Sequence, residues 1–275
     1  IVSVQLQSNF SRLLAKGDPT SVQMILDGRK SNASQIVTGY LTSILQTFNA
    51  DILEEKGIKL SEPLPIDSRA FFNPNLEYIY YNVPCLVAML SMLLALTLTA
   101  MSVSRERENG TFDQLLVSPL QPWEILMGKL IPAMIIGIGE SSALMLIAFY
   151  FFNVPFTGSF LLLYFSMIVF LLSMVGIGLF ISSLSHTQQQ SILGSFVFMT
   201  PTILLSGYAT PIENMPYWLQ PFTHILPITH FFIIIKGLFL KNMPASDVLM
   251  HTWPMALIAL FTLAIAGWMF KRRME

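Results

Sequence analysis

The chain of 275 residues is 53% hydrophobic and 11% charged, whereas about a quarter of the residues in an ordinary soluble domain are charged. The mean hydropathy is +0.62, so the composition excludes a typical soluble protein and indicates a membrane protein. With a net charge of −1, no overall field attracts nucleic acid, and none is expected as a partner. The single cysteine, Cys85, excludes an intrachain disulfide.

Residues 1–80 predict a small α/β domain outside the membrane. Alternating apolar residues indicate strands at 1–6 and 21–28, with a short helix between them. Apolar residues at helical spacing predict an amphipathic helix over 32–51. Residues 64–84 are rich in aromatic side chains and are expected to carry the chain back to the bilayer. This region contains no catalytic constellation.

Residues 81–275 predict a transmembrane domain. Five stretches are long and apolar enough to cross a hydrocarbon core about 30 Å thick, and they cover 82–104, 130–152, 160–182, 191–207 and 251–270. The chain opens with neither Met nor a signal sequence, so an exported N-terminal domain implies a further helix before Ile1 and six spans in the natural protein. The predicted fold class is an α-helical polytopic membrane protein with a small α/β domain at the N-terminus.

The basic residues near the span ends predict the orientation, because Lys and Arg gather on the cytoplasmic side. The relevant residues are Arg105, Arg107, Lys129, Lys271, Arg272 and Arg273. They place the C-terminus in the cytoplasm and leave residues 1–80 and 207–245 outside.

A compact charged run, "SRERENGTFDQLLV", follows the first span. Phe112, Leu115 and Leu116 recur at i, i+3 and i+4, which predicts an amphipathic helix over 105–117 along the inner membrane surface. One interpretation is that the basic residues only set the topology. The other is that the helix offers a charged grip to a cytosolic protein, which Glu106 and Glu108 favour because a topology signal needs no acidic residues.

Glu140 lies midway along its span in "GIGESSAL". A carboxylate facing lipid at that depth costs several kcal/mol, so Glu140 is expected to face a bundle interior, a dimer interface or a water-filled path. Its role is either helix packing against a polar partner or contact with a cationic substrate or gate.

The segment 207–245 contains five prolines and several aromatic residues. Its two hydrophobic pieces, Trp218–Leu226 and Phe231–Leu240, are too short to span and predict re-entrant or interfacial helices. His224 and His230 have no third ligand nearby in the sequence, so no metal site is expected.

The source of energy is expected to lie outside the chain. The sequence contains no G-x-x-x-x-G-K-[ST] loop that would hold ATP phosphates. Ion-coupled carriers usually carry several ionisable residues in their spans, whereas here Glu140 is almost alone.

The stretch "RERENGTFDQLLVSPLQPWEILMGKLIP" resembles the signature of ABC-2 type permeases, the membrane subunits of ATP-binding-cassette exporters, whose pattern is E-[RK]-E-x-G-T-x-x-x-L-x-x-[ST]-P-L. The stretches "FFNPNLEYIYYNVPCLVAML", "LSGYATPIENMPYWLQPFTHILPITHFFIIIKGLFL" and "VQMILDGRKSNASQIVTGYL" are also similar to this family. The resemblance covers essentially the whole chain and is to the multidrug-type inner-membrane permeases of Gram-negative bacteria. In one departure, Cys85 stands where the family usually has Gly.

The resemblance implies an ABC-2 exporter fold in the inner membrane of a bacterium, with residues 1–80 in the periplasm. It also implies a first cytoplasmic coupling segment that docks on a separate ATPase. Glu106, Arg107 and Glu108 would enter a groove of that subunit, and Gly110 and Thr111 would shape the bend. The connection around 186–190 would make a second contact, or would simply be a polar hairpin that keeps backbone out of lipid. The full ATPase-coupling set is Arg105, Glu106, Arg107, Glu108, Gly110, Thr111, His186 and Gln188.

The family also implies that the external segment caps a translocation path. The candidate path or gate residues are Glu140, Tyr208, Pro211 and Trp218. The chain is expected to have no catalytic residue and to bind no cofactor, because ATP and Mg would bind to the partner ATPase.

The function implied is that of a permease subunit that exports drug-like or amphiphilic compounds. Two copies, or this chain and a close paralogue, would enclose the path within the lipid bilayer and be driven by two cytosolic ATPases. Export of a lipid or lipid-linked glycan is the alternative within the class. A membrane-anchored assembly or sensing protein is the alternative from another class, and the sequence leaves open whether residues 1–80 recruit a periplasmic adaptor.

Overall fold

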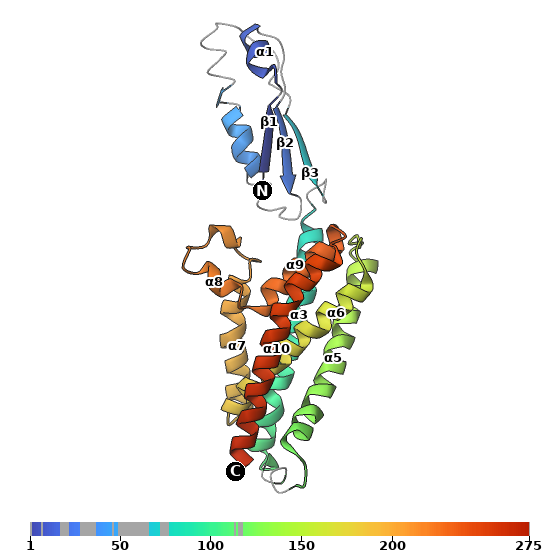
Figure 1. Ribbon diagram of the computed structural model, residues 1–275, viewed down its shortest axis with the longest axis vertical. Helices are drawn as coiled ribbons and strands as arrows, with labels where there is room; N and C mark the ends of the chain where they lie inside the picture. The colour runs from blue at the N-terminus through green and yellow to red at the C-terminus, as the bar shows by residue number, and fades with distance from the viewer. Residues whose placement is uncertain are drawn as a thin grey trace. The chain divides into compact units, whose positions relative to one another are not determined.

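The computed structural model describes residues 2–6, 8–16, 22–27, 37–45, 47, 48, 66–71, 77–112, 114 and 118–274. The chain divides into two compact units, Ile1–Tyr81 and Asn82–Glu275 (Figure 1). The boundary expected after Tyr80 falls next to this division. The two units are described separately below.

The first unit contains a three-stranded sheet in the order β1-β2-β3. Its strands are β1 (Val2–Leu6), β2 (Val22–Asp27) and β3 (Ile66–Phe71), and α1 (Phe10–Lys16) connects the first two. β1 pairs with β2 antiparallel, and β2 pairs with β3 parallel. Val22 and Met24 of β2 are buried, as the alternation of side chains along a strand requires when one face is covered.

The sequence analysis missed β3. The strand reads IDSRAF, in which polar residues interrupt any apolar alternation, and its parallel partner is far away in the sequence. A local pattern cannot reveal such a pairing, because parallel strands need a long connection. Residues 37–45, 47 and 48 are helical, within the helix predicted over 32–51. Residues 32–36, 46 and 49–51 of that prediction lie outside the described residues.

The second unit is a bundle of helices. In the described part of the chain, four helices are long and apolar enough to cross a membrane. They are α3 (Tyr78–Glu108), α5 (Pro122–Tyr150), α6 (Phe160–Leu184) and α10 (Ala245–Met274). Four of the five predicted spans therefore have the length and composition that spanning requires.

The fifth predicted span, 191–207, corresponds to α7 (Gln188–Leu205), which is not one of these four. It has 18 residues and begins with three glutamines, so its continuous apolar part is short. In Figure 1, α7 nevertheless runs lengthwise beside the longer helices.

Several helices begin earlier than the apolar stretches suggested. α5 begins at Pro122 instead of Leu130, and α9 (Pro227–Leu240) begins at Pro227 instead of Phe231. Both helices begin at a proline, which suits the first turn of a helix because its φ is already helical and no N–H is needed there. Of the piece expected at Trp218–Leu226, only α8 (Gln220–Thr223) is helical, after the turn η2 (Ile212–Asn214).

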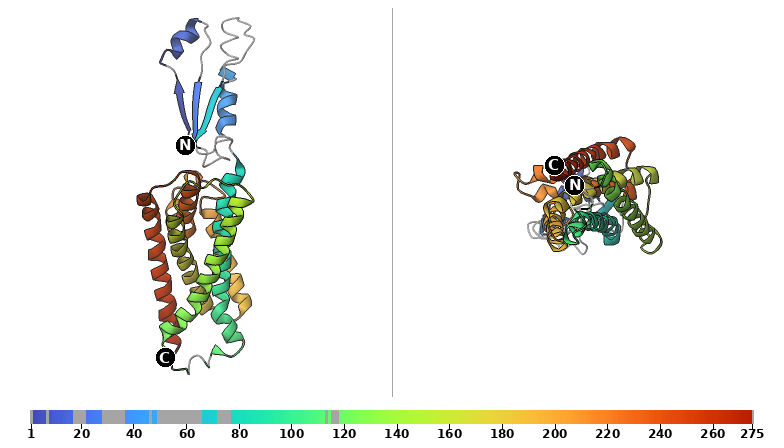
Figure 2. Two further views of the ribbon diagram at one scale, coloured as in Figure 1. Left: turned by 90° about the vertical axis from the view of Figure 1, so that its right-hand side faces the viewer. Right: turned by 90° about the horizontal axis from the view of Figure 1, so that it is seen from below.

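α6 is the central helix of the bundle. It contacts α5, α7, α9 and α10, and its Ser182 Oγ accepts a hydrogen bond of 3.0 Å from the Val103 N–H of α3. Figure 2 shows this bundle from the side and along its helices. Gly176 and Gly178 of α6 lie against Thr262 of α10 and Thr99 of α3, where an added Cβ would collide with the threonine hydroxyls. Small residues therefore allow these backbones to approach closely.

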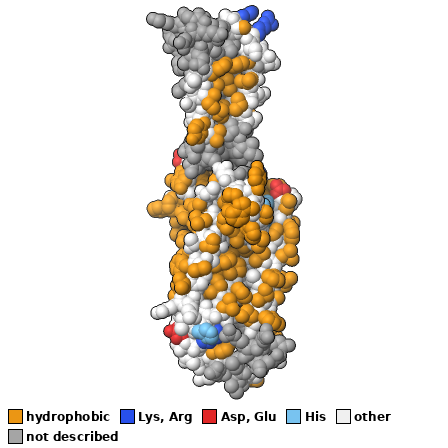
Figure 3. Space-filling view, turned by 90° about the vertical axis from the view of Figure 1, so that its left-hand side faces the viewer, with side chains coloured by type: hydrophobic (Ala, Val, Ile, Leu, Met, Phe, Trp, Pro, Cys, Tyr) orange, Lys and Arg blue, Asp and Glu red, His pale blue; other side chains and the backbone are white. Residues whose placement is uncertain are grey.

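The bundle has two ends of different chemistry. The charged end is made of residues 105–111, Lys129 and 185–188. The aromatic end is made of residues 149–160, 206–230 and the last turn of α9, and includes the rings of Phe149, Phe156 and Phe239 within 5.5 Å of one another. Between the ends, hydrophobic side chains cover the face seen in Figure 3.

We expect Gly178→Val to lower the stability of the bundle and Gly139→Val to leave it nearly unchanged. The valine at position 178 must displace Thr99 or Leu96 of α3, whereas nothing lies within 4 Å of a Cβ at position 139. Overpacking of this kind costs about 1–3 kcal/mol. Thermal unfolding of both variants in the same detergent measures the difference, and equal melting temperatures would contradict close packing of α3 on α6.

Candidate functional site

The charged run forms the last turn of α3. The helix predicted over 105–117 does not begin at Arg105, because residues 105–108 continue α3 without a break. The chain then turns at Gly110, whose φ of 71° is left-handed. Thr111 N–H donates to the Glu106 carbonyl at 2.9 Å and Gly110 N–H to the Arg107 carbonyl at 3.1 Å. These two bonds close the helix in the way that a glycine after its end permits.

The difference from the prediction has a physical reason. The apolar spacing of Phe112, Leu115 and Leu116 suggested one amphipathic helix, but the glycine before it favours a helix end. Phe112 is helical and packs against Val103 and Ile125. Residues 113 and 115–117 of the predicted helix lie outside the described residues.

Arg107 joins α3 to the end of α6. Its Nη1 donates to the carbonyl oxygens of Ser183 at 3.0 Å and Ser185 at 2.7 Å, and its guanidinium lies 4.9 Å from the centroid of the Phe112 ring. The last carbonyls of a helix have no intrahelical donor and carry partial negative charge. Arg107 therefore donates hydrogen bonds to free carbonyl oxygens at the end of α6 and places a positive charge beside their partial negative charge.

Glu106 joins α3 to α5. Its Oε1 lies 2.6 Å from Lys129 Nζ, and the side chains of Lys129 and Glu106 are only 9% and 29% exposed. The second oxygen, Glu106 Oε2, is buried and has no hydrogen-bond partner among the described residues. This ion pair is partly buried, unlike the exposed pairs that contribute little to stability.

Gln188 joins the end of α3 to the start of α7. Its backbone N–H and its Nε2 both donate to Glu108 Oε2, at 2.9 and 3.2 Å. Arg105 Nε in turn donates to Gln188 Oε1 at 3.2 Å. A carboxylate at the first turn of a helix is favourable because the free N–H groups point at it. The backbone N–H of His186 donates to Gln190 Oε1 at 2.9 Å, and its side chain is exposed.

The structure thus brings the predicted coupling residues from both connections together at the charged end. Glu106, Arg107 and Gln188 are half-buried, with the bonds described above. The exposed members of the set are Arg105, Glu108, Gly110, Thr111 and His186.

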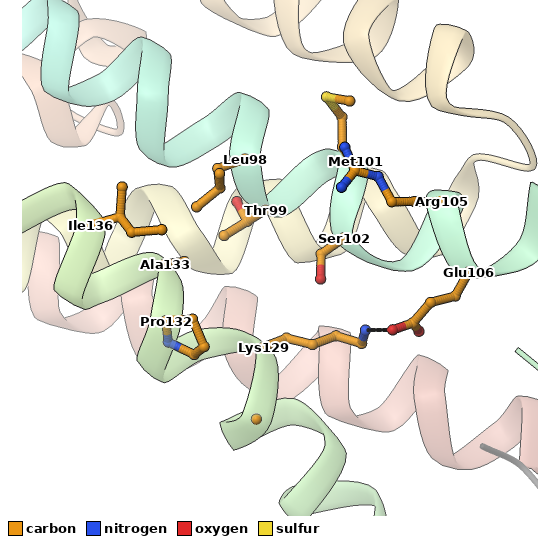
Figure 4. Close-up of a pocket in the computed structure, with 11 residues that line it drawn as sticks. Leu98, Thr99, Met101, Ser102, Arg105, Glu106, Lys129, Pro132, Ala133 and Ile136 are labelled. Atoms are coloured by element: carbon orange, nitrogen blue, oxygen red, sulfur yellow. Dashed lines mark hydrogen bonds and ion pairs between the residues drawn. The ribbon is translucent and has the colours of Figure 1, made fainter. Parts of the chain in front are cut away.

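A pocket of about 420 Å³ opens between α3 and α5 at this end (Figure 4). On one side of the pocket, the Glu106–Lys129 ion pair joins the two helices. On the other side, they are joined by a 2.7 Å hydrogen bond between the hydroxyls of Ser91 and Ser141. Its lining residues are Leu98, Thr99, Met101, Ser102, Arg105, Glu106, Gly128, Lys129, Pro132, Ala133 and Ile136. The sequence analysis did not predict this pocket, whose walls come from two different helices.

The four candidate path or gate residues do not form one site in the described structure. Glu140 lies in the middle of α5, where its Oε2 is buried and has no partner among the described residues. Tyr208 Oη donates to Asn82 Oδ1 of α3 at 3.1 Å. Pro211 precedes η2 and is half-buried, and Trp218 is 70% exposed. No contact between Glu140 and the other three candidates is recorded among the described residues.

The aromatic end contains a histidine contact that the sequence analysis missed. His230 Nε2 lies 2.8 Å from the carbonyl oxygen of His224, and His230 Nδ1 lies 3.3 Å from His251 Nδ1 of α10. A carbonyl only accepts, so the proton of neutral His230 is on Nε2 and His251 Nδ1–H donates to His230 Nδ1. The described residues contain no group of three His, Cys, Asp or Glu side chains suited to a metal ion.

The apolar spanning helices and the charged end together define a multi-pass membrane protein. Residues 2–268 match the family described as "ABC-2 family transporter protein", and the chain belongs to this family. It is therefore a membrane transport permease.

Three relatives from Escherichia coli strain K12 carry the same assignment in their names. The chain is 44% identical to "Probable multidrug ABC transporter permease YbhR" over 99% of its length and 74% of that protein. It is 30% identical to "Probable multidrug ABC transporter permease YbhS", covering 99% of this chain and 73% of that protein. It is 27% identical to "Inner membrane transport permease YhhJ", covering 96% and 71%.

We expect Arg107→Ala to destabilise the bundle more than Arg105→Ala. Arg107 binds two carbonyl oxygens of α6, whereas exposed Arg105 makes one hydrogen bond to a side chain. Loss of hydrogen bonds to a charged group costs about 2 kcal/mol. Thermal unfolding in detergent provides the comparison, and a larger loss in the Arg105 variant would contradict the assigned role of Arg107.

We expect the histidine contact to weaken in acid. Burial lowers the pKa of His230 from its ordinary value, so the folded protein binds fewer protons than the unfolded chain just below about pH 6.5. The free energy of unfolding therefore falls as the pH falls through that range. Melting temperatures at about pH 7.5 and about pH 5.5 should differ less in His230→Gln than in the parent. His224→Gln is the control, because its side chain is exposed and its carbonyl is kept; an unchanged pH dependence in His230→Gln would contradict the prediction.

Proposed function

We propose that the chain is the permease half of an ATP-driven exporter, and that a separate ATP-binding-cassette ATPase binds its charged end. The observation that carries this proposal is the joining of three helix ends at one place. Arg107 connects α3 to α6, and Glu108 connects α3 to α7 through Gln188. A displacement of the turn after α3 is therefore passed to all three helices.

The two parts of the charged end have different roles in this proposal. Glu106 and Arg107 bind groups within the bundle, which suits them to transmit motion from a docked subunit. Glu108, Thr111 and His186 are exposed and form the contact surface. His186 extends that surface to the second connection, which is one of the two interpretations that the sequence analysis left open.

The charged end faces the cytosol in this proposal, and residues 1–80 lie in the periplasm. The positive-inside rule supports this orientation through Arg105, Arg107 and Lys129. The relative named as an inner membrane permease supports the bacterial inner membrane as the location. ATP and Mg would bind to the partner, because the sequence has no phosphate-binding loop.

The substrates in this proposal are drug-like or amphiphilic compounds. The names of two relatives include the term multidrug. Two permeases, either two copies or this chain with a close paralogue, would enclose the path, and flexible Met side chains would allow it to accept different shapes. Membership of a transporter family favours export over an anchoring or sensing role.

The test is purification of the full-length permease in mild detergent from its host, with mass identification of bound proteins and an ATPase assay. We expect a stoichiometric ATPase to accompany the parent and Thr210→Arg. We expect Thr111→Arg to lose it by about tenfold or more, which corresponds to about 1.4 kcal/mol.

Both threonines are exposed, one at each end of the bundle, so the two variants add the same charge. A parent protein that purifies without any ATPase would overturn the proposal. Equal ATPase recovery with Thr111→Arg and Thr210→Arg would place the contact elsewhere and contradict the assigned surface.

A further inference from the structure

The pocket between α3 and α5 has an apolar end and a charged end. Figure 4 shows Leu98 and Ile136 on the apolar side, and Lys129 reaching Glu106 on the charged side. Its apolar walls point toward the middle of the two spanning helices, and its charged wall belongs to their ends. This gradient matches a molecule that has an apolar chain and a polar head.

The charges of the pocket limit what the polar head is. Arg105 and Lys129 are positive and Glu106 is negative, so the lining carries one net positive charge. Lys129 pairs with only one oxygen of Glu106, and the other oxygen, Oε2, is buried without a hydrogen-bond partner in the described part of the chain. An unpaired buried acceptor is costly, so a ligand that donates a hydrogen bond to it gains a specific contact.

The wall of α5 includes a proline in the helix interior. Pro132 has no N–H and cannot donate to the carbonyl of Gly128 one turn earlier, and both residues line the pocket. The polar side of the pocket combines two cationic side chains with one buried carboxylate oxygen, Glu106 Oε2, that has no hydrogen-bond donor among the described residues.

Three simple ligand classes fit this combination poorly. A free phosphate ion leaves the apolar walls uncovered, and a purely anionic amphiphile brings no donor to Glu106 Oε2. A purely cationic amphiphile is opposed by the net positive charge of the lining. A head that carries both a phosphate and an N–H donor satisfies all of these groups.

We propose that this pocket binds an aminophospholipid from the membrane leaflet at the charged end. Its phosphate lies toward Arg105 and Lys129, its primary ammonium donates to Glu106 Oε2, and an acyl chain packs against Leu98 and Ile136. The site requires neither an ATPase nor a transport cycle, so it stands independently of the proposed function. Glu106 and Lys129 also join α3 to α5. A bound lipid would therefore strengthen the contact between these two helices, close to the turn at Gly110.

The first test compares phosphatidylethanolamine with phosphatidylcholine of identical acyl chains on the full-length chain purified in detergent, with bound lipid counted by native mass spectrometry. The two lipids share the phosphate, but only ethanolamine has N–H donors. We expect phosphatidylethanolamine to bind at least about tenfold more tightly. Equal binding of the two, or tighter binding of phosphatidylglycerol, would overturn the proposal, as would displacement of the lipid by millimolar inorganic phosphate.

The second test locates the site with neighbouring residues of α5. Ile136 lines the pocket, whereas Ile135 does not line it and is 66% exposed. We expect Ile136→Trp to abolish the preference for phosphatidylethanolamine and Ile135→Trp to retain it. The same preference in both variants would contradict the site. The comparison of lipids on the parent chain decides the chemistry even if a tryptophan variant fails to fold.

Discussion

The carbonyl oxygens at the end of α6 need donors, and Arg107 of α3 provides them. A helix that ends near a membrane surface leaves its last carbonyls unpaired, and unsatisfied backbone groups are expensive where water is scarce. Arg107 meets two of these oxygens with one guanidinium. The position of α3 against α6, and therefore the position of its neighbours in the sequence, depends on this contact.

The contact between Arg107 and α6 determines which residues of the charged run point into the bundle and which point outward. Once Arg107 is fixed on α6, Glu106 faces Lys129 of α5 and Glu108 faces the first turn of α7. The bend at Gly110 then exposes Thr111. A short stretch of sequence thus contacts three other helices, α5, α6 and α7. The pocket beside Glu106 results from the same arrangement.

Polar groups inside the bundle are mostly satisfied locally. The hydroxyls of Ser91, Thr99 and Ser104 donate to the carbonyl oxygens four residues earlier in their own helix. Hydroxyls such as Ser91 and Ser141 also meet across helices, where small side chains permit close approach. Glu140 differs, because one of its carboxylate oxygens is buried and has no hydrogen-bond partner among the described residues.

The sequence by itself determined the class of protein, the family and four of the spans, because these depend on composition, on runs of apolar residues and on a motif. It also identified the charged run and the 186–190 connection as places of interest. It did not predict that α3 continues through Glu108, since the apolar residues after Gly110 suggested a helix of their own. It missed the early starts of α5 and α9, because their first turns lie outside the apolar stretches by which the elements were predicted.

Only the tertiary structure decided which charged residues point inward, because that depends on neighbours from other helices. Glu106 points inward because it pairs with Lys129 of α5, and Arg107 points inward because it donates a hydrogen bond to a carbonyl at the end of α6. The pairing of β3 with β2 and the contact of His251 with His230 likewise join residues that are far apart in the chain. Local periodicity reports which face of an element is apolar, but partner choice is set by packing between elements, and no single stretch of the sequence encodes it.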